Sequence, residues 1–224
     1  MSDKIKKIGK LSHAESFLQL NTIKGYEYID RAGRIVNEYH TPEDNPPEFI
    51  MSLEGLVIRN PKPKIIELKV SSNSIWLHFL KPDSLDLILA NTTPEFKKII
   101  DVLNIKELKR IGWRNYFVYE AENKEEIDKI FLKNNQIKNL KTELLGYFIE
   151  ENQSLKTKFN GLLTIAKVIA KSKEGEEKYG ILFDIDLFVK NTINIIDIDK
   201  ILKSFREYLT SEEKFLSIVN KFIS

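Results

Sequence analysis

Glu67 and Lys69 are the residues whose types and spacing come nearest to a catalytic pair. They lie two apart in a strand-like segment, residues 65–70, so both side chains point to one face of the strand. A metal-dependent nuclease uses such a pair: the acid binds a divalent cation, and the lysine positions or activates water. That site also needs an upstream acid on an adjoining strand, for which Glu54 is the candidate. Ordinary alternation of buried and solvated residues explains the segment without catalysis, and we favour that interpretation.

A second pair of carboxylates, Asp184 and Asp186, shares a strand face in the segment 181–187. Two carboxylates in this arrangement can hold a magnesium ion. The alternative is an acidic, solvated face on a half-buried strand, with the apolar residues between the acids packed inward. We favour the alternative and predict no metal site, with Asp184 and Asp186 as the candidates if a metal does bind.

Cations and aromatic residues crowd the segment 97–116. Rings interleaved with cations suit single-stranded nucleic acid, because every base has a flat face and every phosphate a charge. Strand alternation places Arg110 and Arg114 on one face and Trp113 on the other, which predicts that the tryptophan belongs to the core. Lys109, Arg110 and Arg114 are therefore the candidate nucleic-acid contacts, although a structural role explains them as well.

His78 alternates with Trp76 and Leu80 on one face of its strand, and no serine or cysteine nucleophile motif accompanies it. We expect a packed or edge histidine and not a general base. The chain has no cysteine, which excludes disulfides and thiolate chemistry, and its nine glycines form no phosphate-binding loop. The sequence therefore predicts no catalytic residues and no cofactor.

The overall charge is balanced: the formal net charge is +2 although 30% of the residues are charged. A mixed-sign surface of this kind does not steer polyanions strongly. Residues 1–10 are basic but lack the apolar stretch of a signal peptide, and no window approaches the roughly 20 apolar residues of a membrane span. We expect a cytoplasmic protein that does not contact a membrane.

Hydrophobic periodicity, prolines and capping residues predict both strands and helices. The strand-like segments are residues 16–20, 49–58, 64–70, 75–80, 108–119, 140–150, 159–171 and 179–189. The expected helices are residues 26–39, where residues 30–34 could instead turn a hairpin, a helix that begins at Thr93–Pro94, and residues 124–134, 197–209 and 211–223. The last three strands read as an antiparallel meander.

These segments predict an α+β fold: a mostly antiparallel sheet, or sheets, with a C-terminal helical pair packed on one face. Residues 1–15 are expected to form a basic, disordered tail, and residues 16–224 a single α+β unit. If the unit is subdivided, the boundary falls near residues 134–139. No internal repeat is visible in the sequence.

Residues 110–116, with the sequence RIGWRNY, resemble the RIGLRYIN strand of a sporadically distributed, functionally uncharacterised prokaryotic protein family. The preceding helix, the FDID segment at 183–186 and a C-terminal helix are similar to the layout of that family. Trp113 stands where the family has leucine, and Asn115 does not fall where the family's asparagine falls. The resemblance implies a layout for residues 65–224 and a prokaryotic source, and it implies no catalytic residues.

Because no catalytic set is complete, we expect a non-enzymatic interaction module that acts through a protein partner or by forming a homo-oligomer. The alternative is a nucleic-acid-binding protein of a prokaryotic defence or mobile-element system, which uses Lys109, Arg110 and Arg114. A third hypothesis is a metal-dependent nuclease built on Glu67 and Lys69.

Overall fold

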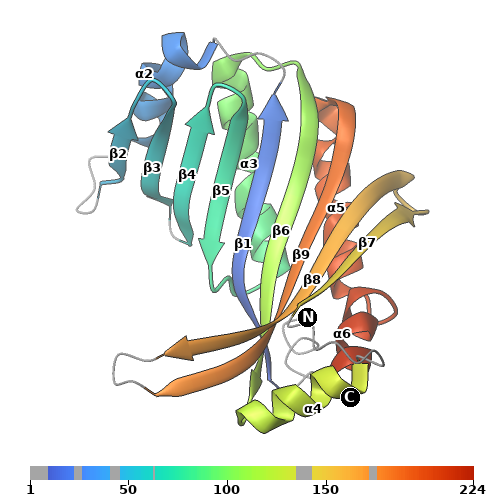
Figure 1. The fold of residues 1–224 in the computed structure, drawn as a ribbon. Helices are drawn as coiled ribbons and strands as arrows, with labels where there is room; N and C mark the ends of the chain where they lie inside the picture. The colour runs from blue at the N-terminus through green and yellow to red at the C-terminus, as the bar shows by residue number, and fades with distance from the viewer. Residues whose placement is uncertain (1–9, 23–26, 41–45, 63, 135–142, 172–175) are drawn as a thin grey trace.

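Nine antiparallel strands form one sheet in the described part of the computed structural model (Figure 1). The structure describes residues 10–22, 27–40, 46–62, 64–134, 143–171 and 176–224. The strand order is β2-β3-β4-β5-β1-β6-β9-β8-β7. The predicted α+β class and antiparallel sheet are thereby confirmed.

The strands are β1 (Leu11–Thr22), β2 (Glu48–Met51), β3 (Gly55–Lys62), β4 (Ile65–Ser71), β5 (Ser74–Leu80), β6 (Glu107–Ala121), β7 (Glu143–Asn152), β8 (Thr157–Lys171) and β9 (Glu177–Asn194). The helices are α2 (Glu27–Tyr39), α3 (Leu85–Leu103), α4 (Lys124–Asn134), α5 (Ile198–Thr210) and α6 (Phe215–Ile223), and a short 3₁₀ turn, Ile195–Asp197, precedes α5.

The chain contains a structural repeat that the sequence does not reveal. One half runs β1-α2-β2-β3-β4-β5-α3 and the other runs β6-α4-β7-β8-β9-α5-α6. In each half, the last strand of a meander returns to pair with the first strand, and the two first strands, β1 and β6, pair at the centre of the sheet. The two halves are therefore joined by backbone hydrogen bonds into one continuous sheet.

Alternation along the central strands separates a buried face of the sheet from an open one. On β6, Ile111 and Trp113 are fully buried, whereas Arg110 and Arg114 lie on the opposite face, as the alternation predicted. On β9, likewise, the buried Phe183 and Ile185 alternate with Asp184 and other residues of the open face. The apolar core thus fills the buried face.

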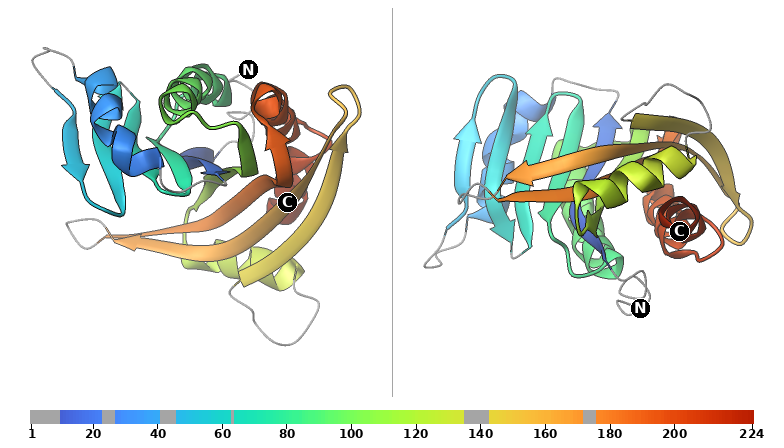
Figure 2. Two further views of the ribbon diagram at one scale, coloured as in Figure 1. Left: turned by 90° about the horizontal axis from the view of Figure 1, so that it is seen from above. Right: turned by 60° about the horizontal axis from the view of Figure 1, so that its bottom comes forward.

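Helices cover the buried face. The helices α3 and α5 run side by side along the sheet, which curves around them (Figures 1 and 2). Near the other end of the long strands, α4 and α6 meet on the same face, where the ring of Phe222 packs edge-on against Phe131 at 5.3 Å and Phe183 at 5.9 Å between centroids. The C-terminal helical pair therefore packs on the sheet as predicted.

A buried carboxylate ties α2 and α3 to β3. Glu95 of α3 is only 1% exposed, and its carboxylate accepts a hydrogen bond from the Tyr39 hydroxyl of α2 and forms an ion pair with Lys62 of β3. Lys98 lies 3.9 Å from the same carboxylate and 4.6 Å from the centre of the Tyr39 ring. A charge buried this deeply needs such partners, so we assign the cluster a structural role.

The start of α3 differs from the prediction. The helix begins at Leu85, because the Ser84 hydroxyl accepts a hydrogen bond from the backbone N–H of Leu87 at 3.1 Å and caps the first turn. Pro94, which we expected at the first helical position, lies inside the helix. Packing of the apolar face against the sheet outweighs the hydrogen bond that the proline cannot make.

Three further boundaries differ from the sequence analysis. The strand-like segment 49–58 is two strands, β2 and β3, because residues 52–54 turn between them. The helix α6 begins at Phe215 and not at Ser211. Strand β1 begins at Leu11, so residues 11–15 belong to the sheet, whereas the first nine residues of the expected tail and residues 135–139 of the expected boundary lie outside the described residues.

Candidate functional site

The face of the sheet opposite the helices, hereafter the open face, carries a row of aromatic and charged side chains at its centre. The described helices pack on the other face, so none of them covers the side chains of the open face. The central open-face residues are Glu15, Phe17 and Gln19 of β1, Trp76 and His78 of β5, Arg110, Gly112, Arg114 and Tyr116 of β6, and Asp184 and Asp186 of β9.

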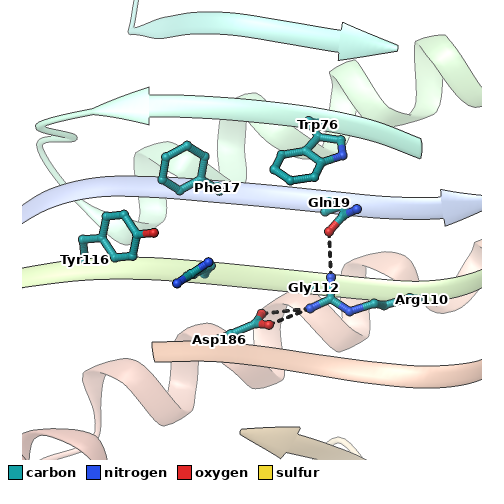
Figure 3. Close-up of a pocket in the computed structure, with 8 residues that line it drawn as sticks. Phe17, Gln19, Trp76, Arg110, Gly112, Tyr116 and Asp186 are labelled. Atoms are coloured by element: carbon teal, nitrogen blue, oxygen red, sulfur yellow. Dashed lines mark hydrogen bonds and ion pairs between the residues drawn. The ribbon is translucent and has the colours of Figure 1, made fainter. Parts of the chain in front are cut away.

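A pocket of about 160 Å³ lies at this centre, hereafter the central pocket (Figure 3). Three adjacent strands supply its rings: Trp76 from β5, Phe17 from β1 and Tyr116 from β6. Trp76 is 39% exposed and lines the pocket. The remaining lining residues are Gln19, Arg110, Gly112, Arg114 and Asp186.

Arg110 crosses the floor of the central pocket and is held at its far end. Its guanidinium donates to Gln19 Oε1 at 2.9 Å and to both carboxylate oxygens of Asp186 at 3.0 and 2.7 Å (Figure 3). Asp186 lies directly opposite Arg114 in the sheet, and Arg114 is four residues after Arg110 on β6. The side chain of Arg110 therefore runs over Gly112, the residue between, whose missing Cβ leaves it room.

Arg114 forms a second ion pair between β6 and β9, with Asp184. Its Nε and Nη2 donate to the two oxygens of Asp184 at 2.8 and 2.5 Å, a bidentate arrangement, and its guanidinium lies 5.2 Å from the centre of the Tyr116 ring. The hydrogen bonds that Arg114 donates to Asp184 raise the pKa of Arg114. Arg110 and Arg114, the two arginines that line the central pocket, are therefore each neutralised by an aspartate within the fold.

Burial raises the pKa of Asp186, although the charge of Arg110 and the hydrogen bonds that it donates act in the opposite direction. The side chains of Arg110 and Asp186 are only 16% and 23% exposed. Arg110 therefore opposes the effect of burial and favours the ionised form of the carboxylate.

His78 continues the aromatic row. Its Nε2 lies 3.1 Å from Glu15 Oε2, and its ring stacks on Phe17 with centroids 4.2 Å apart and planes 15° from parallel. The ring of Phe17 in turn meets Tyr116 edge-on at 5.6 Å. The predicted packed histidine thus forms part of a continuous aromatic cluster across three strands.

Replacing Gly112 with alanine should lower the free energy of unfolding by about 1–3 kcal/mol, the usual cost of overpacking. A Cβ at Gly112 would lie 2.3 Å from Arg110 Nη1 and 2.7 Å from its Cζ, so the guanidinium has to leave Asp186. Urea unfolding measures the change. The control is Gly33→Ala in α2, where a Cβ meets no atom within 4 Å and the helix should gain up to about 1 kcal/mol. Equal stability of Gly112→Ala and the parent protein would contradict this account of the pocket floor.

Glu67 and Lys69, the candidate nuclease pair, lie far from Glu54, the acid that the sequence suggested as their partner. Glu67 and Lys69 sit on the open face of β4, where Glu67 is paired with His78 on one side and Arg59 on the other. Glu54 lies in the turn before β3, next to the end of β4 at Ser71, about 13 Å along the strand from Glu67 at 3.3 Å per residue. Within the described ranges, no three His, Asp or Glu side chains are grouped so that they could hold a metal.

Asp184 and Asp186 lie on one strand face, as predicted. The positive groups beside their carboxylates are the guanidiniums of Arg114 and Arg110, whereas the sequence had made the two acids candidate ligands of a magnesium ion. Asp184 accepts hydrogen bonds from Nε and Nη2 of Arg114, and both oxygens of Asp186 accept from Nη2 of Arg110. Of the three candidate nucleic-acid contacts, Arg110 and Arg114 donate to these aspartates, and Lys109 is exposed. The structure thus brings the acidic and the basic candidates together as partners.

Sequence reasoning missed Gln19, Phe17 and Glu15 as members of this site. They lie about a hundred residues from β6 in the chain, and antiparallel pairing of β1 with β6 brings them to the pocket. The signal that could have identified them was alternation in β1, where the buried Leu18 and Leu20 leave Phe17 and Gln19 on the other face.

No family model matches this chain, and no curated protein is significantly similar to it. None of the described helices is long and apolar enough to cross a bilayer. The resemblance of residues 110–116 to a prokaryotic family strand therefore stays a prediction, and the function has to be argued from the geometry of the open face.

Proposed function

We propose that the protein is a non-enzymatic interaction module that binds a protein partner through the open face of its sheet. The observation that carries this proposal is the central pocket, which has three rings from adjacent strands at its rim and ion pairs beside it. Protein interfaces have this anatomy, with aromatic anchors at the centre and polar groups around them. We propose the cytoplasm as its compartment, because a chain without cysteine lacks the disulfide framework that is common in secreted domains.

The size and lining of the pocket favour one aromatic side chain of the partner as its occupant. A cavity of about 150 Å³ accommodates one benzene molecule, and the central pocket encloses about 160 Å³. Phe17, Trp76 and Tyr116 supply ring faces and edges for offset or edge-to-face contacts. Both guanidiniums are already neutralised by aspartates, which favours an uncharged group over a phosphate.

Nucleic-acid binding is less well supported by the same geometry. Arg110 and Arg114 would have to give up Asp186 and Asp184 to reach a phosphate, and the carboxylates would then face the polyanion. Of the three suggested contacts, only Lys109 is exposed and outside these two ion pairs. A nuclease at Glu67 and Lys69 would need a second acid beside them, and their strand neighbours are His78, Arg59, Trp76 and Val57.

Photo-crosslinking from the rim of the pocket tests the proposal. With p-benzoylphenylalanine in place of Trp76, irradiation of the cells that make the protein should give a discrete adduct with another polypeptide, because the partner's ring would lie against this position. The control places the same photo-reactive residue at Leu132 of α4, which is 58% exposed and lies on a helix of the other face. We expect little adduct from the control.

Three outcomes overturn the proposal. The first is a position-76 adduct that is no stronger than the control. The second is an adduct that nuclease treatment removes, which would make nucleic acid the ligand of the open face. The third is an adduct that contains a second copy of this chain alone. Mass spectrometry of the crosslinked peptide distinguishes them.

A further inference from the structure

The two edge strands of the sheet are protected very differently. Strand β2 has four residues, follows Pro46 and Pro47, and carries the ion pair between Glu48 and Arg59 at 3.1 Å. Natural edges are blunted by such features, namely shortness, proline and charge. Strand β7, at the other edge, has ten residues and no proline, and it pairs with β8 along its whole length without a register shift. It is a long, regular edge.

The same strand exposes a row of large apolar side chains. Leu145, Tyr147 and Ile149 alternate on the open face and are 70%, 62% and 57% exposed. No described strand pairs with the outer side of β7. A long and regular edge with an apolar row is a template for another strand, because its outward N–H and C=O groups have no partner in the sheet.

We propose that β7 pairs antiparallel with β7 of a second copy of this chain, so that the two sheets become continuous. The two-fold axis runs perpendicular to the sheet, midway between Tyr147 of one copy and Tyr147 of the other. Side chains that lie opposite each other in an antiparallel pair point to the same face, so the residue at a perpendicular axis has to lie opposite its own copy in the second chain. Of the possible centres, Tyr147 is the one that places the apolar residues opposite each other.

The residue pairs in this register are complementary in size. Leu145 of each copy lies opposite Ile149 of the other, and the two Tyr147 residues lie opposite each other, which joins the apolar rows. Gly146 lies opposite Phe148 of the second copy. Phe148 packs on Tyr208 of α5 at 5.2 Å between centroids, whereas Gly146 has open space, with no atom nearer than 3.9 Å to a Cβ built there. The bulky residue of one strand thus meets the smallest residue of the other.

Light scattering and engineered cysteines test the proposal together. The parent protein should have twice the monomer mass of 26.1 kDa, and Tyr147→Lys should return it to the monomer mass, because two lysines would face each other at the axis. Leu132→Lys is the matched control on an exposed apolar residue of α4 and should remain dimeric. Circular dichroism shows whether each variant is folded.

The cysteine test reports the register, since the parent chain has no cysteine. Residues opposite each other in an antiparallel pair have Cα atoms about 4.5–5.5 Å apart, within the range that a disulfide spans. Tyr147→Cys alone should oxidise to a covalent dimer. Leu145→Cys should do so only when mixed with Ile149→Cys.

A monomer mass for the parent protein at all concentrations overturns the proposal, as does a Tyr147→Cys variant that crosslinks no faster than Leu132→Cys. So does a dimer that survives in Tyr147→Lys. These results leave the open-face proposal unaffected, because the crosslink from position 76 reports a different surface.

Discussion

Replacing Arg110 with methionine should lower the free energy of unfolding by about 3 kcal/mol at pH 7, because it leaves the carboxylate of Asp186 without its cation. Both side chains are largely buried, and three of the hydrogen bonds described above end on this guanidinium. Methionine keeps the length and the apolar stem of the side chain, so the loss reports the charge and the hydrogen bonds. Urea unfolding at pH 7 measures it.

A double-mutant cycle provides the control. Asp186→Asn removes the carboxylate charge, and the double variant Arg110→Met/Asp186→Asn should recover part of the loss, with a coupling of about 1–3 kcal/mol between the two sites. If the two single changes add without coupling, the ion pair seen across the pocket floor does not contribute to stability.

The same variant should be more sensitive to pH than the parent protein. The pKa of Asp186 is already raised by burial, and Arg110 is the chief influence that lowers it. Without Arg110 the pKa rises further. A group whose pKa is higher in the folded state stabilises the fold at low pH and loses this contribution as pH rises through the folded pKa. The stability difference between the two proteins should therefore be smallest at acidic pH, where Asp186 is protonated, and largest at neutral pH.

The second large effect is a loss of stability on acidification that arises from His13. Burial lowers the pKa of His13 to about 4 from its ordinary value of 6.5, and its ring stacks on Phe117 with centroids 4.5 Å apart. At neutral pH the imidazole is uncharged in both folded and unfolded chains. Below 6.5 the unfolded chain binds a proton that the folded chain does not bind until about pH 4, so stability falls across this range. At about 1.4 kcal/mol per pH unit, the total loss is about 3 kcal/mol.

His13→Phe removes the titrating group and keeps a ring against Phe117. Unfolding measured at intervals from pH 7 to pH 4 should show a fall in stability that is smaller by about 3 kcal/mol in the variant than in the parent protein. An equal fall in the parent protein and His13→Phe would contradict burial of a neutral imidazole.

Local pattern determined the elements and the faces of this protein. Alternation in residues 108–119 placed Trp113 in the core and Arg110 with Arg114 on the other face, because a strand repeats every two residues whatever its partners. The same reasoning found helix 124–134, whose bounds the structure reproduces. Local pattern was less reliable at α3. Thr93 and Pro94 predicted a helix start, although Ser84 caps the helix ten residues before Pro94.

The tertiary structure alone decided which of these residues meet. Arg110 and Asp186 lie 76 positions apart, and Arg110 and Gln19 lie 91 apart. Which strands become neighbours, and in which register, depends on how the two halves of the chain bury their apolar faces under a common layer of helices. No local pattern encodes that choice, since a shift of two residues preserves every face while it changes every partner. The sequence by itself therefore determined which face each side chain takes, and the pairing of β1 with β6 and of β6 with β9 made separate acids, cations and rings into one site.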